Sequence, residues 1–214
     1  MHALRLISML AAGLVSAVPA LAVTVVPAGA IWQYSFAEPG AGWQTGADAG
    51  VAWQSGPAPF GNCGQPGVDC LGFDPLFVGQ TPWPEDTSGL LTDDLWVRRT
   101  IDLSDFDPLT QTLQWNLGVD NGYALYVNGV LLSQDNAEGF TFRWEYTGAV
   151  PASMLVAGDN WIAVALEDHG ELTAFDMEIT TGATPPPVPE PATILLWLGG
   201  LGLVPVLNRR RAPR

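Results

Sequence analysis

Large apolar and polar residues alternate along much of the chain between residues 23 and 184. Residues 113–119 and 141–146 both place a bulky apolar side chain at every second position. Successive side chains of a strand point to opposite faces, so each pattern predicts a strand with one buried face. No stretch of ten or more residues in this region shows the 3.6-residue period of an amphipathic helix.

The strongest turn signal is Asn128-Gly129, which separates the apolar residues 123–127 from residues 130–132. Both turn residues tolerate positive φ, so the sequence predicts a β-hairpin with a type I′ turn. Residues 161–166 are apolar at every position. This pattern predicts a central strand that is covered on both faces.

Further strands are expected at residues 96–103, 172–180, 30–36 and 50–54. Short strands at spacings of about a dozen residues, separated by Gly, Pro and Asp, indicate an all-β fold. The sequence therefore predicts an antiparallel β-sandwich domain over residues 23–184, which is long enough for one core.

The N-terminal segment has the pattern of a secretory signal peptide. Arg5 precedes the apolar residues 6–18, and the small residues Ala20 and Ala22 occupy the two positions that a signal peptidase reads. We expect residues 1–22 to be a signal peptide that signal peptidase cuts after Ala22.

The C-terminal segment has three parts. Residues 185–191 form a proline-rich spacer, which favours an extended polyproline II conformation. The apolar residues 192–207 predict a transmembrane helix of roughly 24 Å, short for a hydrocarbon core of about 30 Å, so arginine snorkelling or local thinning must close the gap. Residues 208–214 form a cytoplasmic basic tail, in which Arg209, Arg210 and Arg211 act as the stop, and the positive-inside rule places residues 23–191 outside the cytoplasm.

The sequence Val188-Pro189-Glu190-Pro191-Ala192-Thr193, followed by an apolar helix and arginines, resembles the PEP-CTERM sorting signal of Gram-negative bacteria that make extracellular polysaccharide. The resemblance covers about residues 185–214. It implies that Pro189, Glu190 and Pro191 are the sorting motif, which a membrane-embedded protease, the exosortase, recognises and cleaves at or near this element. The alternative is an ordinary membrane anchor that is never cut.

Charge is distributed unevenly along the chain. All 22 acidic residues lie between Glu38 and Glu190, whereas the only basic residues in that interval are Arg98, Arg99 and Arg143. Three basic and 22 acidic residues give residues 23–191 a formal net charge of −19. Such a surface argues against nucleic acid as a partner and keeps the product soluble.

The two cysteines, Cys63 and Cys70, are close in sequence and bracket glycines and a proline. In an oxidising compartment such a pair predicts a disulfide that closes a surface loop. The expected stabilisation is about 2–3 kcal/mol.

Residues 117–129 and 155–164 are similar to the jelly-roll domain of the galactose-binding-like superfamily. The first contains the hairpin that ends in Val127-Asn128-Gly129, and the second contains a Leu-x-x-Gly-x-Asn corner. Residues 53–61 also resemble the opening loop of such modules. The resemblance implies the fold more strongly than a ligand, because this architecture serves as sugar-binding module, spacer and adhesion unit.

One cluster, Glu167-Asp168-His169-Gly170-Glu171, combines carboxylates with an imidazole. A glycosidase needs two carboxylates at a fixed separation, which sequence does not supply. We interpret the cluster as a solvated turn, and no G-x-S-x-G, H-E-x-x-H or phosphate-binding glycine loop is present. The sequence therefore predicts no catalytic residues.

No resident cofactor is expected, and the metal-binding residues stay unknown. A structural Ca²⁺ is the alternative, because aspartates supply the hard oxygen ligands it prefers. The candidates are Asp93, Asp94, Asp102, Asp105, Asp107, Asp168 and Asp176. No D-x-D-x-D-G loop is present, and residues 103–108 also fit a loop with turn-forming aspartates.

These features predict an exported envelope or matrix protein that starts in the inner membrane and reaches the cell surface. Its sandwich is expected to contact extracellular polysaccharide, and Trp32, Trp43 and Trp83 are aromatic residues that could stack on sugars. Two alternatives are a secreted enzyme that acts on glycans, centred on residues 167–171, and a purely structural surface protein.

Overall fold

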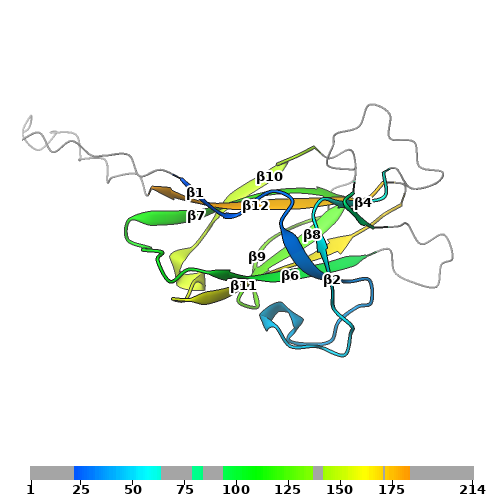
Figure 1. Cartoon of the computed structure of the whole chain (residues 1–214), viewed down its shortest axis with the longest axis horizontal. Helices are drawn as coiled ribbons and strands as arrows, with labels where there is room; N and C mark the ends of the chain where they lie inside the picture. The colour runs from blue at the N-terminus through cyan, green and yellow to red at the C-terminus, as the bar shows by residue number, and fades with distance from the viewer. Residues whose placement is uncertain (1–21, 64–78, 84–93, 137–141, 171, 184–214) are drawn as a thin grey trace, which may run out of the picture. The chain divides into compact units, whose positions relative to one another are not determined.

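Two β-sheets, antiparallel except for one short parallel pair of strands, pack face to face in the computed structural model, which describes residues 22–63, 79–83, 94–136, 142–170 and 172–183. Figure 1 shows the sheets as two layers, with β1, β7, β10 and β12 in one and β2, β6 and β11 in the other. All described residues belong to one unit of structure, which ends at Ala183.

Each sheet has six strands. The strands of the first sheet, sheet A, are β10 (Tyr146–Val150), β7 (Gln111–Asp120), β12 (Ala174–Ala183), β4 (Phe60–Gly61), β5 (Thr81–Pro82), and β1 (Val23–Val26), which pairs with β12. Those of sheet B, in spatial order, are β3 (Gln54–Pro57), β2 (Ile31–Ser35), β6 (Leu95–Asp102), β11 (Asp159–Glu167), β8 (Gly122–Val127) and β9 (Val130–Asp135). Two short 3₁₀ helices are described, η1 (Trp43–Thr45) and η3 (Ala152–Met154). The β-sandwich predicted from the alternating pattern is therefore present.

The core fills the space between the sheets with alternate side chains of both. β7 contributes Leu113, Trp115, Leu117 and Val119, and Phe175 of β12 packs edge-on against Trp32 at a ring-centroid distance of 5.4 Å. Large aromatic side chains bury more apolar area than any other residue type, so they dominate the stability of such a core.

The predicted hairpin is confirmed. Val127 pairs with Val130, and the two residues between them, Asn128 and Gly129, have φ values of 50° and 80°. Gly129 is required for a second reason, because a Cβ at this position would lie 2.8 Å from Cγ2 of Thr45.

The central position of β11 is also confirmed, because β11 pairs with β6 on one side and β8 on the other. Its inner face, with Ile162 and Val164, joins the main core. Its outer face places Ala163 in a second apolar cluster with Trp43 and Trp96. Residues around η1 therefore cover this face.

Two predicted strands were wrong. Of the strand predicted over residues 141–146, residues 142–145 form a turn in which Trp144 has a φ of 64°, and Phe142 is exposed. In this turn Arg143 donates a hydrogen bond to Asp176, and its guanidinium lies 5.0 Å from the Trp144 ring. These contacts favour the turn over a regular strand. The strand predicted over residues 50–54 begins only at Gln54, because Ala49 and Gly50 adopt the positive φ of a turn.

None of the residues described in the structure belongs to a helix long and apolar enough to cross a bilayer. The predicted transmembrane helix, residues 192–207, lies outside the described residues. So does the predicted signal peptide, apart from the exposed Ala22. Both stay predictions.

Asn160 fixes the corner that leads into β11. Its buried side-chain amide donates to the carbonyl oxygens of Val156 and Gly158, and its Oδ1 accepts from the Val156 N–H and from Nδ2 of Asn128. One side chain thus joins the corner to the hairpin turn on the neighbouring strand.

We expect Asn160→Ala to lower the free energy of unfolding by about 2–3 kcal/mol, because it leaves several buried polar groups without partners. Gln134→Ala on the exposed edge strand β9 should change it by less than about 0.5 kcal/mol. Urea unfolding of both variants measures the difference. An Asn160→Ala variant as stable as Gln134→Ala would show that the corner does not depend on this amide.

Candidate functional site

Arg98 holds the residues around η1 against the outer face of sheet B. It is only 3% exposed, its Nε donates to Oε1 of Gln33 (2.9 Å), and its Nη1 donates to the carbonyl oxygens of Trp43 (3.2 Å) and Ala47 (2.5 Å). Its Cζ also lies 3.8 Å from the centre of the Trp53 ring, a cation–π contact. Arg98 therefore has hydrogen-bond acceptors and an aromatic partner within the fold.

Trp161 lies beside Arg98, on the outer face of β11. The Arg98 guanidinium is 5.4 Å from its ring, and a side chain at Gly46, whose φ is 91°, would collide with the ring. These neighbours fix the position of a tryptophan that remains only half-buried. Trp161 forms one wall of a small pocket.

The pocket, which we call the Arg99 slot, has a volume of about 200 Å³. It opens next to the point where the pairing of β2 with β6 ends, at Gln33 and Arg98. Its lining comes from four neighbouring strands of sheet B and includes Trp32, Gln33, Ser55, Arg99, Thr100 and Trp161. No acidic residue of the described part of the chain lines it.

Arg99 differs sharply from its neighbour Arg98. Its Nε and Nη1 are buried and have no hydrogen-bond partner in the described part of the chain. The guanidinium lies 5.5 Å from the ring of Trp32, whose own Nε1 also lacks an acceptor there. Burial lowers the pKa of Arg99, and no carboxylate among the described residues offsets this effect.

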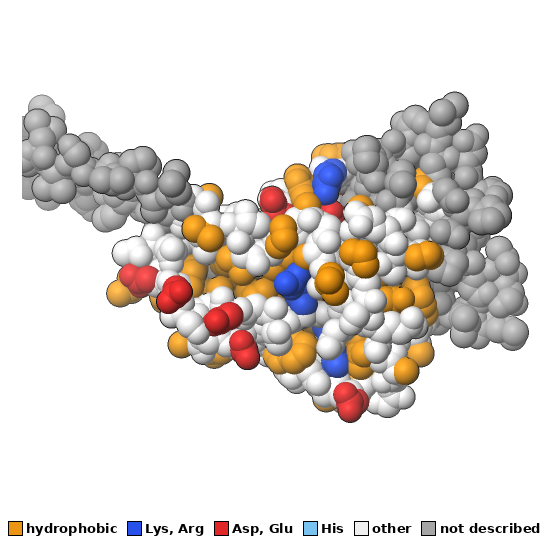
Figure 2. Space-filling view, in the orientation of Figure 1, with side chains coloured by type: hydrophobic (Ala, Val, Ile, Leu, Met, Phe, Trp, Pro, Cys, Tyr) orange, Lys and Arg blue, Asp and Glu red, His pale blue; other side chains and the backbone are white. Residues whose placement is uncertain are grey.

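Arg99 alternates in phase with Val97 and Ile101 of the main core, so its buried nitrogens lie on the inner side of sheet B, whereas Gln33 and Trp161 line the pocket from the outer side. A buried donor without a partner is unfavourable, so these nitrogens lower the stability of the folded state. Figure 2 shows separate basic and acidic side chains on the visible face, with hydrophobic and uncharged surface between them. The two adjacent arginines in a chain with so few cations were the sequence signal for this site, but their different surroundings were not readable from sequence.

The predicted cluster at residues 167–170 is a hydrogen-bonded turn at the end of β11. Oδ1 of Asp168 accepts from the N–H of Gly170 (2.9 Å), and Oδ1 of Asn121 accepts from the N–H of His169 (2.9 Å). Nε2 of His169 is 3.5 Å from Oε2 of Glu167. Glu171 lies outside the described residues. The imidazole therefore has a carboxylate neighbour, while Asp168 binds backbone.

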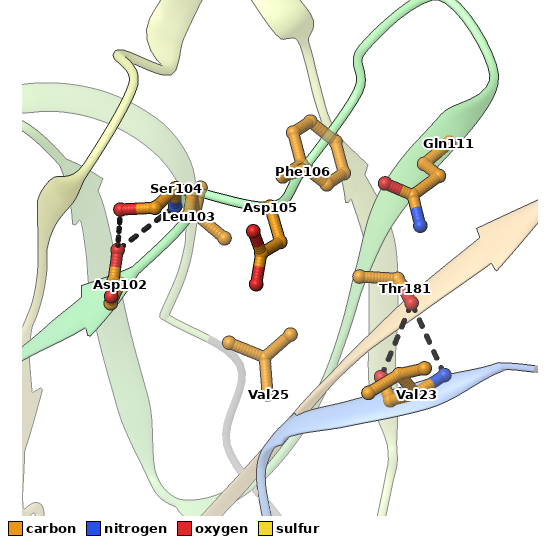
Figure 3. Close-up of a pocket in the computed structure, with 9 residues that line it drawn as sticks. All are labelled: Val23, Val25, Asp102, Leu103, Ser104, Asp105, Phe106, Gln111 and Thr181. Atoms are coloured by element: carbon orange, nitrogen blue, oxygen red, sulfur yellow. Dashed lines mark hydrogen bonds between the residues drawn. The ribbon is translucent and has the colours of Figure 1, made fainter.

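The aspartates proposed as calcium ligands are spread over the sandwich. Asp102 and Asp105 line a pocket of about 350 Å³ where β1 and β12 pair, with Val23, Val25 and Thr181 nearby. Figure 3 shows Asp105 directed into this pocket and Asp102 turned toward Ser104.

Most of these carboxylates already have protein partners. Asp102 accepts from the N–H and the hydroxyl of Ser104, which lowers its pKa, and Asp107 accepts from the N–H of Leu109 and the hydroxyl of Thr110. Within the described ranges no three His, Cys, Asp or Glu residues are grouped so that they could hold a metal ion. Asp93 lies outside those ranges.

Asp176 has a structural role. Its fully buried carboxylate accepts from the N–H groups of Gly29 (3.0 Å) and Met177 (2.8 Å), and its Oδ2 is 2.8 Å from Nη2 of Arg143. Burial raises the pKa of this carboxyl, and the hydrogen bonds and Arg143 oppose that shift.

The three tryptophans considered for sugar stacking are not available for it. Trp32 and Trp83 are completely buried and Trp43 is 6% exposed. Trp43 and Trp83 lie in stretches rich in glycine and proline, whereas Trp32 lies in the strand predicted over residues 30–36. Trp32 and Trp83 fill the main core, and Trp43 belongs to the cover of sheet B. The half-buried tryptophans Trp53 and Trp161 were not singled out.

The remaining predicted site residues fall mostly outside the described part of the chain. This holds for Ala20, Cys70, the motif Pro189, Glu190 and Pro191, and Arg209, Arg210 and Arg211. Cys63 is buried and is not a free thiol, but its predicted partner is not described, so the Cys63–Cys70 pairing stays a prediction.

No protein-family model and no curated protein matches this chain. Similar solved structures include an uncultured Clostridium sp. β-glucuronidase, with 12% identity, a TM-score of 0.45, and coverage of 78% of this chain and 31% of that one. A Bacteroides vulgatus β-glycosidase has 15% identity and a TM-score of 0.48, with coverage of 76% and 20%. The Bacteroides uniformis β-glucuronidase 2 has 16% identity and a TM-score of 0.48, with coverage of 77% and 18%.

The chain spans less than a third of the length of these three proteins. At such identities the likeness concerns the β-sandwich fold alone. The activities in their names belong to those enzymes.

The buried carboxyl of Asp176 predicts a specific pH dependence. Its pKa is raised on folding, so the folded state binds its proton more tightly than the unfolded state, and this contribution to stability is lost as pH rises through the folded pKa. We therefore expect the wild type to gain stability relative to Asp176→Asn as the pH is lowered from neutral toward 4. Urea unfolding at several pH values measures the difference, and a relative loss on acidification would contradict the assignment.

Proposed function

We propose that this chain is an exported protein of the cell envelope or extracellular matrix, whose β-sandwich contacts surface polysaccharide without breaking it down. The observation that carries the export and sorting part is the order of elements after residue 184. A proline-rich spacer with Pro189-Glu190-Pro191, a short apolar segment and three consecutive arginines follow one another without a gap.

The position of the domain between its two signals supports this proposal. β1 begins at Val23, directly after the predicted signal-peptidase site, and β12 ends at Ala183, directly before the spacer. Val23 pairs with Thr181, so both connections leave the sandwich at the same end. Both processing steps would therefore remove chain beyond the strands and leave the core intact.

In this proposal signal peptidase and exosortase are the processing partners. The precursor is held in the inner membrane by residues 192–207, and the processed product lies at the cell surface or in the extracellular matrix. The negative charge of the exported part favours a soluble product that does not adhere to anionic lipid.

The observed β-sandwich supports the proposal that the domain is a galactose-binding-like jelly roll. The type I′ hairpin at Asn128-Gly129 and the Asn160 corner lie at the positions that the resemblance implies. A non-catalytic role also agrees with the turn at residues 167–170, where Asp168 binds the Gly170 backbone.

Replacement of Pro189-Glu190-Pro191 by three alanines tests the sorting step. We expect more than about nine-tenths of this variant to stay in the inner membrane with its full C-terminal mass, because the protease loses the element it reads. Cell fractionation and mass spectrometry measure the outcome. A shortened variant at the cell surface would show that the motif is not the recognition element.

Retention on the host's own polysaccharide tests the role of the sandwich. We expect the full chain in detergent to bind the immobilised polysaccharide and to release no saccharide products, with Glu167→Gln behaving as the wild type. Chromatography of the eluate measures both. Product release that Glu167→Gln abolishes would favour the enzyme, and a chain that is not retained would favour a purely structural protein.

A further inference from the structure

We propose that the Arg99 slot is a binding site for one neutral sugar residue, whose apolar face stacks on Trp161. This inference rests on the proposed function, because it names the part of the sandwich that contacts the polysaccharide and the class of sugar that this part accepts. It follows from the side chains that line the slot on the outer face of sheet B.

The register of the strands gives the slot two apolar walls with a hydroxyl between them. Thr100 of β6 pairs with Trp161 of β11. Gln33 of β2 pairs with Arg98, so Ile31, two residues earlier, lies on the other side of Thr100. The walls Ile31 and Trp161 are therefore two strand spacings apart, roughly 9.5 Å. A flat ring in van der Waals contact with a wall on each side needs about 7–8 Å.

Trp161 is held in one position without a ligand. Its N–H donates to Oδ1 of Asn128 (2.8 Å), and its carbonyl oxygen accepts from the Asn128 N–H (2.9 Å). Gly46 contacts the indole closely, because a Cβ at this position would collide with the ring. The ring is only half-buried, and it lines the slot. A fixed aromatic ring loses little conformational entropy when a ligand stacks on it.

The polar side chains of the slot match the hydroxyl groups of a sugar. Oε1 of Gln33 accepts from Nε of Arg98, so the amide nitrogen of Gln33 remains as a donor. The exposed residues Ser55 and Thr100 add hydroxyls, each of which can donate and accept. A sugar ring has an apolar face for Trp161 and hydroxyls for these groups. A purely apolar ligand would instead take the polar groups out of water without giving them partners.

The charges around the slot favour a neutral sugar over a basic or an acidic one. No carboxylate of the described residues lines it, so a basic sugar would have no ionic partner there. Arg98 already donates to three oxygen atoms, and the buried nitrogens of Arg99 lie on the inner side of the sheet. Neither arginine therefore presents its charge to a carboxylate in the slot. The net charge of −19 on residues 23–191 further disfavours acidic polymers.

The size of the slot limits the ligand to one sugar residue. Its volume of about 200 Å³ is below the roughly 300–1,000 Å³ of ordinary small-molecule pockets. One residue of a polysaccharide would enter, and its neighbours in the polymer would stay outside. A ligand of this size with few contacts should bind with a dissociation constant of about 1 mM.

Frontal affinity chromatography of the full chain in detergent, on the host's immobilised polysaccharide, tests the site. We expect Trp161→Leu to weaken binding at least about tenfold, because it removes the flat apolar face. Thr100→Val should weaken binding at least about threefold without lowering the Tm, because it removes an exposed hydroxyl and keeps the shape. The matched controls Trp144→Leu and Thr147→Val make the same changes near or on β10 of the other sheet, and should bind as the wild type.

The salt dependence of retention tests the class of sugar. Binding of a neutral residue releases no counterions, so the dissociation constant should change by less than about twofold between about 50 and 500 mM NaCl. A loss of about tenfold or more over this range would show that a charged group is recognised and would overturn the proposal.

Three results with the variants would also overturn it. One is binding of Trp161→Leu and Thr100→Val equal to that of the wild type, in which case the proposed function survives. The second is a loss in Trp161→Leu alone, which would indicate an apolar contact rather than a sugar site. The third is an equal loss in both controls, which would indicate a general effect on the fold. If the wild type is not retained at all, the proposed function fails as well.

Discussion

The arrangement of sheet B depends on one constraint: β11 has apolar side chains on both faces, and both faces must be buried. Its inner side chains pack against sheet A, but Ala163 on the outer face would be left in water without the residues around η1. Arg98 meets this need, because one guanidinium bonds the backbone of that segment, bonds Gln33 of β2 and stacks on Trp53. A small pocket lies where the pairing of β2 with β6 ends, and Trp161 beside it is only half-buried.

Much of the fold was predictable because period-two patterns and turn chemistry are local. Asn128-Gly129 and the apolar strand at residues 161–166 were predicted correctly for this reason. The strand predicted at residues 141–146 was wrong, because the chain turns here and Arg143 binds Asp176, which is 33 residues away in sequence. The alternation of apolar and polar residues does not reveal this distant contact. Sequence pattern records which residues alternate, and it does not record which distant partner a polar side chain meets.

The candidate site was much less predictable than the fold. Trp43 and Trp83 looked like exposed aromatics because glycine and proline surround them, yet both are buried, as is Trp32 in its predicted strand. Conversely, Arg98 and Arg99 are identical in sequence terms, and only their opposite faces on β6 separate a satisfied cation from one whose buried donors lack acceptors. The aspartates considered as calcium ligands mostly accept hydrogen bonds from nearby residues instead. Asp102, for example, accepts a hydrogen bond from the hydroxyl of Ser104.

In the proposed function, the folded domain lies between two signals that are removed during export. The strands begin at Val23 and end at Ala183, and both connections leave from one end of the sandwich. The intact mass of the native protein recovered from the cell surface tests this claim most directly. The account predicts a chain that starts at Val23 and ends near Pro189-Glu190-Pro191. A surface form that still carries Trp197 and the arginines at 209–211 would contradict it.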